Sequence, residues 1–269
     1  MRDRLQDIFS LRDEVAVVTG GYGNLGPWWV KALLDANAIV TIIELPNLKI
    51  PIELQKLQKE YKKKVRFYEA DITDLNNFRS VHKKINKEVG LVSILVNNAG
   101  IDVRPSKITK KPDRSQEVIR FRKMWDVNVQ GIVNCIEEFL PDMIKKESGS
   151  IINIGSLYAE VSPHEGIYNH LGFDKPWAYG ATKAAVVQTT RHYATRLAKY
   201  GIRVNSLSPG GVLGSQDKEF IRKYSERVPL GRMVEKDKDL AGPLIFLASD
   251  ASSYVTGINL QVDGGYTAW

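Results

Sequence analysis

Near the amino terminus, residues 15–26 read VAVVTGGYGNLG, an apolar run followed at once by a glycine-rich turn. The run predicts a buried strand over residues 15–19, and Pro27 suits the first position of a following helix because its missing N–H needs no partner there. Glycine permits a tight turn and a close approach of the backbone to a pyrophosphate, and the helix start directs free N–H groups at it. The sequence therefore predicts a dinucleotide-binding turn that contains Gly20, Tyr22, Asn24, Leu25 and Gly26.

A carboxylate ends the next apolar run, which reads IVTIIE over residues 39–44. Glu44 stands roughly 20 residues past the glycines, where a carboxylate can accept both hydroxyls of an adenosine ribose. It would repel a 2′-phosphate, and residues 20–26 contain no Arg or Lys to offset that repulsion. We therefore expect NAD rather than NADP as the cofactor. The alternative interpretation is a solvated residue at the end of a strand.

Apolar runs alternate with helical patterns along the whole chain. The expected strands are 15–19, 39–44, 65–69, 94–97, 150–154, 203–208 and 260–262, and the expected helices are 27–36, 52–62, 75–89, 115–144, 178–200 and 238–249. Short, almost wholly apolar strands are typical of a sheet covered on both faces, and crossovers of this length predict parallel, right-handed βαβ units. Because no linker, repeat or low-complexity segment interrupts the pattern, we expect an α/β protein with one domain over residues 1–269.

Composition excludes several classes of protein. The 269 residues include 43% hydrophobic residues but no apolar run of the length that crosses a membrane, and the charged amino terminus does not resemble a signal peptide. Cys135 is the only cysteine, so a disulfide within the chain is impossible, and we expect a cytoplasmic protein. The net charge is +7, but the basic stretches 56–66 and 104–123 contain acidic neighbours. This mixture favours solvated helix faces over a nucleic-acid surface, and the excess charge would help to attract anionic ligands.

A tyrosine and a lysine four residues apart form a candidate acid–base pair. Residues 179–183 read YGATK at the start of an expected helix, which places Tyr179 and Lys183 one turn apart on one face. A free phenol has a pKa near 10, which is too high for proton transfer at neutral pH. An ammonium about 4 Å away would favour the phenolate by roughly 4 kcal/mol at an effective dielectric of about 20, before desolvation is subtracted. Such pairs also occur by chance on exposed helices.

Further motifs in a fixed order accompany this pair. They are the turn at 19–26, NNAG at 97–100, Asn128, Ser156, SPG at 208–210 and VTGINLQVDGG at 255–265. Together with Tyr179 and Lys183 they resemble the short-chain dehydrogenase/reductase family over essentially the whole chain. The resemblance implies a single-domain Rossmann-type fold, in which a doubly wound parallel sheet of about seven strands carries helices on both faces. It also implies a homotetramer or a homodimer.

The resemblance further implies a role for each matching residue. Tyr179 would be the general acid/base, Ser156 would hold the substrate oxygen, Lys183 would lower the pKa of Tyr179 and bind the nicotinamide ribose, and Asn128 would bind a water for proton relay. The other cofactor contacts would come from Asp71 and Ile72 at the adenine, Asn98, Ala99 and Gly100 at the ribose, and Pro209, Gly210 and Val212 at the nicotinamide. Plainer roles remain open, since Asn98 could close a strand end, Ser156 could cap a turn and Asp71 could cap a helix.

Three features depart from the common family pattern. Asn24 replaces the middle glycine of the turn, no Thr follows Pro209-Gly210, and Ser156 lies unusually far from Tyr179. The resulting loop, residues 156–178, interleaves aromatic and hydrogen-bonding side chains, a composition suited to gripping a polyol. We expect substrate contacts from Tyr158, His164, Tyr168 and Trp177. His164 and His170 lack a Cys or carboxylate partner at ligand spacing, so no metal site is expected.

This loop, together with SPGG at 208–211 and GGYTAW at 264–269, resembles a branch of the family from bacterial surface-sugar and flagellin-glycan pathways. It suggests a sugar, sugar phosphate or sugar nucleotide as the substrate. Residues 211–230 are expected to form a substrate lid, with a charged amphipathic helix at 215–228 that excludes water when it closes.

Other functions remain open at this point. The first is an epimerase or dehydratase of a longer branch, which would need an additional carboxyl-terminal substrate domain. The second is a non-catalytic NAD-binding regulator, and the third is a 3-oxoacyl-(acyl carrier protein) reductase. The preferred hypothesis is an NAD-dependent oxidoreductase that acts on a secondary alcohol or ketone of a small molecule, without nucleic-acid or membrane partners.

Overall fold

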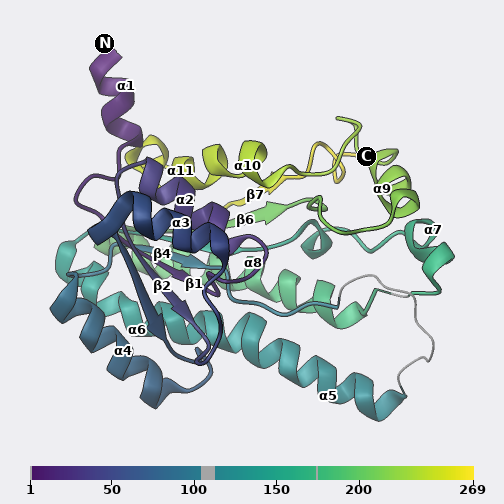
Figure 1. The fold of residues 1–269 in the computed structure, drawn as a ribbon, viewed down its shortest axis with the longest axis horizontal. Helices are drawn as coiled ribbons and strands as arrows, with labels where there is room; N and C mark the ends of the chain where they lie inside the picture. Colours follow the sequence, from purple (N-terminus) through teal and green to yellow (C-terminus); the bar gives the residue numbers. More distant parts are fainter. Residues whose placement is uncertain (1, 104–112, 174) are drawn as a thin grey trace.

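A parallel β-sheet forms the centre of the protein. The structure, a computed structural model, describes residues 2–103, 113–173 and 175–269 (Figure 1). Seven strands lie in the order β3-β2-β1-β4-β5-β6-β7, and every neighbouring pair is parallel. They are β1 (Val15–Thr19), β2 (Ile39–Glu44), β3 (Val65–Glu69), β4 (Ile94–Asn97), β5 (Gly149–Ile154), β6 (Ile202–Pro209) and β7 (Asn259–Val262).

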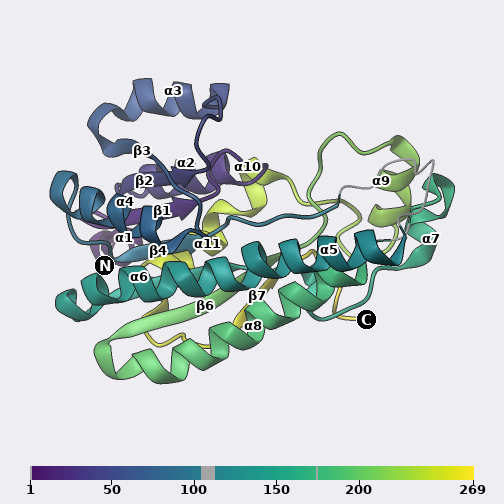
Figure 2. The same ribbon diagram turned by 90° about the horizontal axis from the view of Figure 1, so that it is seen from below.

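Helices cover both faces of the sheet (Figures 1 and 2). In chain order they are α1 (Arg2–Phe9), α2 (Gly26–Asp35), α3 (Ile52–Tyr61), α4 (Leu75–Glu88), α5 (Arg114–Trp125), α6 (Gly131–Lys146), α7 (Glu165–Tyr168), α8 (Trp177–Leu197), α9 (Lys218–Ser225), α10 (Lys236–Asp239) and α11 (Ala241–Ala248). One face carries α2 and α11, whose Trp29, Leu33 and Leu244 pack on Val40 and Ile152. The other face carries α4, α6 and α8. This arrangement confirms the predicted doubly wound α/β sheet of the Rossmann type.

The order of the strands decides where a ligand can bind. The chain proceeds from β1 outward to β3 and then returns to place β4 on the other side of β1. In open parallel sheets, the crevice for a ligand lies at the carboxyl ends of the strands where this reversal occurs. Here that place is between β1 and β4, directly after Thr19 and Asn97.

Two helical predictions need correction. The helix expected over residues 115–144 is interrupted by a π-helical turn, Asp126–Gln130, which separates α5 from α6. The helix expected over 238–249 is two short helices, α10 and α11, and α1 was not expected at all. Residues 104–112 of the predicted basic stretch and residue 174 of the predicted substrate loop lie outside the described residues.

The long loop and the segment after β6 pack on each other. Ile167, Tyr168 and Phe173 of the loop form one buried cluster with Phe220 and Tyr224 of α9. The amphipathic helix expected at 215–228 is present but shorter, as α9 (Lys218–Ser225), and its apolar side faces the loop. Within the described part of the chain, no helix is both long enough and apolar enough to cross a membrane.

Candidate active site

The turn after β1 requires glycine at specific positions. Gly20 has φ +63, and a Cβ placed on it would lie 2.6 Å from Cα of Ala99. A Cβ on Gly26 would lie 2.2 Å from the carbonyl oxygen of Gly21. Both positions exclude any larger residue, so the backbone of the turn passes close to residue 99 and to the start of α2.

Asn98 braces this turn with its side chain. Its Nδ2 donates to the carbonyl oxygens of Gly20 at 2.8 Å and Thr19 at 3.1 Å, and its Oδ1 accepts from Nε1 of Trp29 at 2.8 Å. Ala99 is attached to the same strand end through its N–H, which donates to Oγ1 of Thr19 at 3.2 Å. The amide of Asn98 therefore closes a strand end, as the plainer interpretation of the sequence had it.

Glu44 is fixed at the edge of the turn. The N–H of Tyr22 donates to its Oε2 at 3.0 Å, and the N–H of Leu45 donates to its Oε1 at 2.9 Å. The carboxylate thus lies beside the glycine turn at the carboxyl end of β2, where the sequence placed it. This position fits a ribose with free hydroxyls, because a carboxylate accepts hydrogen bonds from them and repels a phosphate.

The residues of the turn also fit a pyrophosphate. The first N–H groups of α2 have no side-chain cap, since Leu25 precedes the helix. Lys236 of α10 donates from Nζ to Oδ1 of Asn24 at 2.9 Å and so brings a cation to the turn. No local pattern in the sequence indicates Lys236, because 212 positions separate it from Asn24. Asn24, the departure from the family pattern, is the residue that it contacts.

Asp71 and Ile72 follow β3 and have visible structural partners. Oδ1 of Asp71 accepts from the N–H and the hydroxyl of Thr73 at 2.8 and 2.7 Å, so its carboxylate closes a turn. The carbonyl oxygen of Ile72 accepts from Nδ2 of Asn134 at 2.8 Å, and its side chain is buried against Gly131. The contacts of Ile72 therefore hold the segment against α6.

Asn128 and Lys183 meet at the carboxyl end of the sheet. Asn128 is wholly buried in the π-helical turn, and its Oδ1 accepts from the N–H of Ile101 at 2.8 Å while its Nδ2 donates to the carbonyl of Ile101 at 3.0 Å. Nζ of Lys183 donates to the carbonyl of Ile154 at 2.6 Å. A Cβ on Gly100 would lie 3.3 Å from Oδ1 of Asn128 and 3.8 Å from Nζ of Lys183, so one short segment touches both.

Tyr179 and Ser156 complete the group of four. Tyr179 lies in the first turn of α8, one turn before Lys183, and Ser156 follows β5. The hydroxyl of Ser156 accepts from the N–H of Tyr158 at 3.2 Å, so it does cap a turn, and it also lies within reach of the Tyr179 phenol. The structure therefore brings together all four residues that the sequence proposed.

Burial is the largest influence on the pKa of Tyr179. Removal from water raises the pKa of Tyr179 above its ordinary value, the Asp102 carboxylate raises this pKa further, and the hydrogen bond to Ser156 opposes both. Nζ of Lys183 lies 5.9 Å from the centre of the Tyr179 ring and is directed at a backbone carbonyl. Burial lowers the pKa of Lys183 itself to about 8. Desolvation, which cannot be read from sequence spacing, therefore has the first place among the influences on the pKa of Tyr179.

The predicted substrate residues separate into two groups. The hydroxyls of Tyr158 and Tyr168 lie 2.6 Å apart, and Tyr168 is close enough to influence the pKa of Tyr179. Nζ of Lys175 lies near the rings of both Tyr158 and Tyr179. Burial raises the pKa of Tyr168 to about 12, so both hydroxyls are neutral donors and acceptors at neutral pH. His164 is exposed before α7, and the side chain of Trp177 is 64% exposed and stacks on Phe121 of α5. The structure does not join these last two to the Tyr179 group.

The segment after β6 is held between β7 and α9. The N–H of Gly210 donates to the carbonyl of Val262 at 2.9 Å, and the N–H of Gly211 donates to the hydroxyl of Tyr224 at 2.5 Å. Val212 forms a parallel bridge to Val234. Pro209 ends β6, so these residues begin at the same edge of the sheet as Ser156. Among the described residues, no group of three or more His, Cys, Asp or Glu side chains is placed to hold a metal ion.

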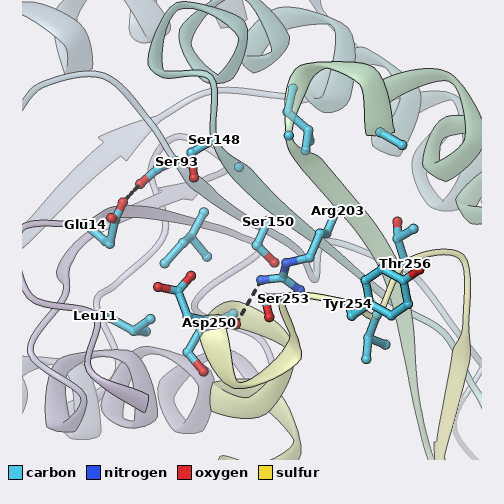
Figure 3. Close-up of a pocket in the computed structure, with 18 of the residues that line it drawn as sticks. Leu11, Glu14, Ser93, Ser148, Ser150, Arg203, Asp250, Ser253, Tyr254 and Thr256 are labelled. Atoms are coloured by element: carbon cyan, nitrogen blue, oxygen red, sulfur yellow. Dashed lines mark hydrogen bonds between the residues drawn. The ribbon is translucent and has the colours of Figure 1, made fainter. Parts of the chain in front are cut away.

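A separate pocket lies at the amino ends of the strands, opposite the carboxyl ends that carry Tyr179 and the glycine turn (Figure 3). It has a volume of about 590 Å³ and is lined by residues at the amino ends of strands, among them Ser93, Ser150 and Arg203. The guanidinium of Arg203 donates to the carbonyls of Leu247 and Ser249 and to the hydroxyl of Ser252, so it ties β6 to the end of α11. The residues that line this pocket include neither Tyr179 nor any residue of the glycine turn.

Comparisons with known proteins agree with this geometry. A family described as enoyl-(acyl carrier protein) reductase matches residues 25–267. The sorbose reductase of Candida albicans is 33% identical over 267 residues, which cover 97% of this chain and 89% of that protein. A 3-oxoacyl-(acyl-carrier-protein) reductase of Thermotoga maritima is also 33% identical, over 95% of this chain and 98% of its own.

A solved structure shows the same fold. The gluconate 5-dehydrogenase of Burkholderia cenocepacia, crystallised with NADP and tartrate, superimposes with a TM-score of 0.84 at 29% identity. The match covers 98% of this chain and 99% of that chain. The similarity therefore extends over the whole sheet and both helical layers.

Proposed function

The chain belongs to the short-chain dehydrogenase/reductase family, and from this premise we propose that it transfers a hydride between NAD and a secondary alcohol of a sugar or polyol. Members of this family are NAD(P)-dependent oxidoreductases that act on CH–OH groups, so the cofactor preference and the substrate are the parts proposed here. The observation that carries the proposal is the convergence of Asn128, Ser156, Tyr179 and Lys183 beside the glycine turn.

We assign a role in the reaction to each of these four residues from its position. Ser156 holds the substrate oxygen beside the phenol, and Tyr179 takes the hydroxyl proton in oxidation or returns it in reduction. Lys183 holds the nicotinamide ribose and connects Tyr179 through Asn128 to solvent. NAD, when bound, supplies the hydride acceptor and a positive charge beside the phenol. That charge favours the phenolate, which burial alone disfavours.

Other residues of the site are proposed to hold the two ends of the cofactor. Glu44 accepts the adenosine ribose hydroxyls, and Gly20 to Gly26 with Lys236 receive the pyrophosphate. Asp71 and Ile72 border the adenine, Asn98 to Gly100 border the ribose, and Pro209, Gly210 and Val212 border the nicotinamide. Glu44 supports NAD over NADP, although the gluconate dehydrogenase of similar structure was crystallised with NADP.

The substrate proposal rests on the long loop. The loop contains two adjoining hydroxyls, those of Tyr158 and Tyr168, and such polar groups suit a ligand with several hydroxyl groups. Sorbose and gluconate in the names of similar proteins support this class of substrate. A surface-sugar branch, a lid at residues 211–230 and a homotetramer or homodimer remain predictions. The 3-oxoacyl-(acyl-carrier-protein) reductase relative supports one rival, an acyl thioester substrate.

A turnover panel tests the proposal. Purified protein is mixed with NAD and sorbitol, galactitol, gluconate, sugar phosphates, sugar nucleotides or a 3-hydroxyacyl thioester, and reduced nicotinamide is followed by absorbance. We expect NAD to be reduced in the presence of at least one sugar or polyol. For Tyr179→Phe we expect kcat to fall at least about 100-fold. Tyr193→Phe, on the same helix and bonded to Glu137, is the matched control and should retain turnover. Turnover of the thioester alone would contradict the sugar proposal.

A further inference from the structure

A second ammonium lies closer to Tyr179 than Lys183 does. Nζ of Lys175 is 4.6 Å from the centre of the Tyr179 ring, whereas Nζ of Lys183 is 5.9 Å from it. Lys175 comes from the long loop, four residues before Tyr179, and its side chain is only 6% exposed. The candidate acid–base residue therefore has one cation from its own helix and another from the loop.

The position of Lys175 is fixed by three sets of contacts. Nζ forms an ion pair with Oδ2 of Asp102 at 2.5 Å and donates to the carbonyl of Val103 at 3.2 Å. It also lies 6.0 Å from the centre of the Tyr158 ring. Since Asp102 follows β4 and precedes Lys175 by 73 positions, this pair joins the loop to the segment after Gly100.

A gain in folding stability alone does not explain a buried ion pair of this kind. Burying a lysine has a desolvation penalty, and a buried ion pair is often no more stabilising than apolar residues of the same volume. Burial lowers the pKa of Lys175, and the Asp102 carboxylate counteracts this effect. Asp102 therefore favours the charged form of Lys175, whose ammonium lies beside the ring of Tyr179.

We propose that Lys175 is a positioning residue whose charge, maintained by Asp102, favours the ionised form of Tyr179. The proposal rests on the proposed function, because it concerns the residue assigned there as the acid–base group. It assigns the long loop an electrostatic task in addition to its contact with substrate.

The sign of the effect follows from the groups around the phenol. Ser156 stabilises the phenolate, whereas Asp102, Tyr168 and burial disfavour it, and the ammonium of Lys183 lies 5.9 Å from the ring centre. Tyr158 faces Lys175 from the other side. If Lys175 loses its charge, the Asp102 carboxylate remains without its counter-ion near Tyr179, so the phenolate becomes harder to form. Removing both charges removes the carboxylate as well and reverses part of that change.

The test titrates Tyr179 directly. The protein is labelled with meta-fluorotyrosine, its NAD-bound form is followed by fluorine NMR as the pH is raised, and Tyr179→Phe identifies the signal among the 11 tyrosines. Lys175→Met should raise the titration midpoint of Tyr179 by about one unit, the lower end of the effect of a charge within about 4–6 Å. Lys175→Arg should keep the wild-type midpoint, and Lys175→Met combined with Asp102→Asn should fall below Lys175→Met.

A lysine elsewhere in the chain provides the matched control. Nζ of Lys199 lies 4.9 Å from the centre of the Tyr200 ring on the surface, so Lys199→Met makes the same chemical change without approaching Tyr179. Its Tyr179 midpoint should equal that of the wild type. The double variant leaves no unpaired carboxylate and keeps the test valid if Lys175→Met does not fold.

Three results would overturn the proposal: equal midpoints in the wild type and Lys175→Met, an equal shift in Lys175→Arg, or a Tyr179 signal that never titrates in the folded wild type. Because the titration needs no turnover, it can fail while the alcohol panel succeeds, and the reverse also holds.

Discussion

Cofactor choice depends on the charge of one side chain, Glu44. Its two carboxylate oxygens are held by the N–H groups of Tyr22 and Leu45, so the charge cannot turn away from the ribose position without breaking both bonds. A 2′-phosphate there would meet a fixed negative charge. The proposed preference for NAD therefore follows from electrostatics and from restricted motion together.

Replacing this carboxylate should relax the preference. In Glu44→Gln, the ratio of kcat/KM with NADP to kcat/KM with NAD should rise at least about tenfold, equivalent to about 1.4 kcal/mol. Glu53→Gln removes an exposed carboxylate from the start of α3, changes the net charge equally and should leave the ratio unchanged. An unaltered ratio in Glu44→Gln would show that its carboxylate does not select the cofactor.

At this scale the sequence identified the reacting residues but not their environment. Tyr179 and Lys183 stand out because a spacing of four residues places side chains on one helix face. Lys175 with Asp102, and Lys236 with Asn24, are partners across 73 and 212 positions, and no local pattern connects them. The raised pKa of Tyr179 arises from burial, which depends on the packing of the whole loop.

Among the elements, the glycine turn and the start of α2 tolerate little change. Gly26 begins α2, and any Cβ there would overlap the carbonyl of Gly21. The turn would have to open, which would move the N–H groups at the start of α2 away from the pyrophosphate position.

A pair of glycine substitutions tests this constraint. Gly26→Ala should lower the affinity for NAD, measured by calorimetry, at least about tenfold, equivalent to about 1.4 kcal/mol. The reason is that a displaced turn loses its hydrogen bonds to the pyrophosphate. Gly242→Ala is the matched control, since a Cβ in that helix meets nothing within 4 Å. It should leave NAD affinity unchanged and stabilise the protein by up to about 1 kcal/mol. Equal NAD affinity in both variants would contradict the assignment of the turn.

Strands were easier to predict than helices. β1 to β4 begin and end where expected, because short apolar runs bounded by polar or glycine residues have few alternatives in a buried sheet. The π-helical turn at Asp126–Gln130 was missed because it shifts backbone hydrogen bonds by one residue and barely alters the apolar pattern. It matters for the site, since it carries Asn128 to Ile101.

For the whole molecule, the sheet order brings distant motifs to one edge. Thr19, Asn97, Ile154 and Pro209 end neighbouring strands β1, β4, β5 and β6, so the turn, the loop after β4, Ser156 and Gly210 meet there. The alternating pattern of the sequence predicts that parallel strands share one carboxyl edge, but it does not give their order. The pattern also does not predict the packing of α9 on the long loop, because the apolar residues of that cluster are shared between two segments about 50 positions apart.

Tracing the hydrogen that leaves the substrate is the most direct test of this account. A sugar or polyol from the turnover panel is prepared with deuterium on the carbon that is oxidised, incubated with NAD and the protein, and the recovered nicotinamide is examined by proton NMR. We expect the substrate's deuterium at C4 of the reduced ring, and no hydrogen from the solvent at that position. Reduced nicotinamide without the label, or oxidation without any reduced nicotinamide, would contradict direct hydride transfer at this site.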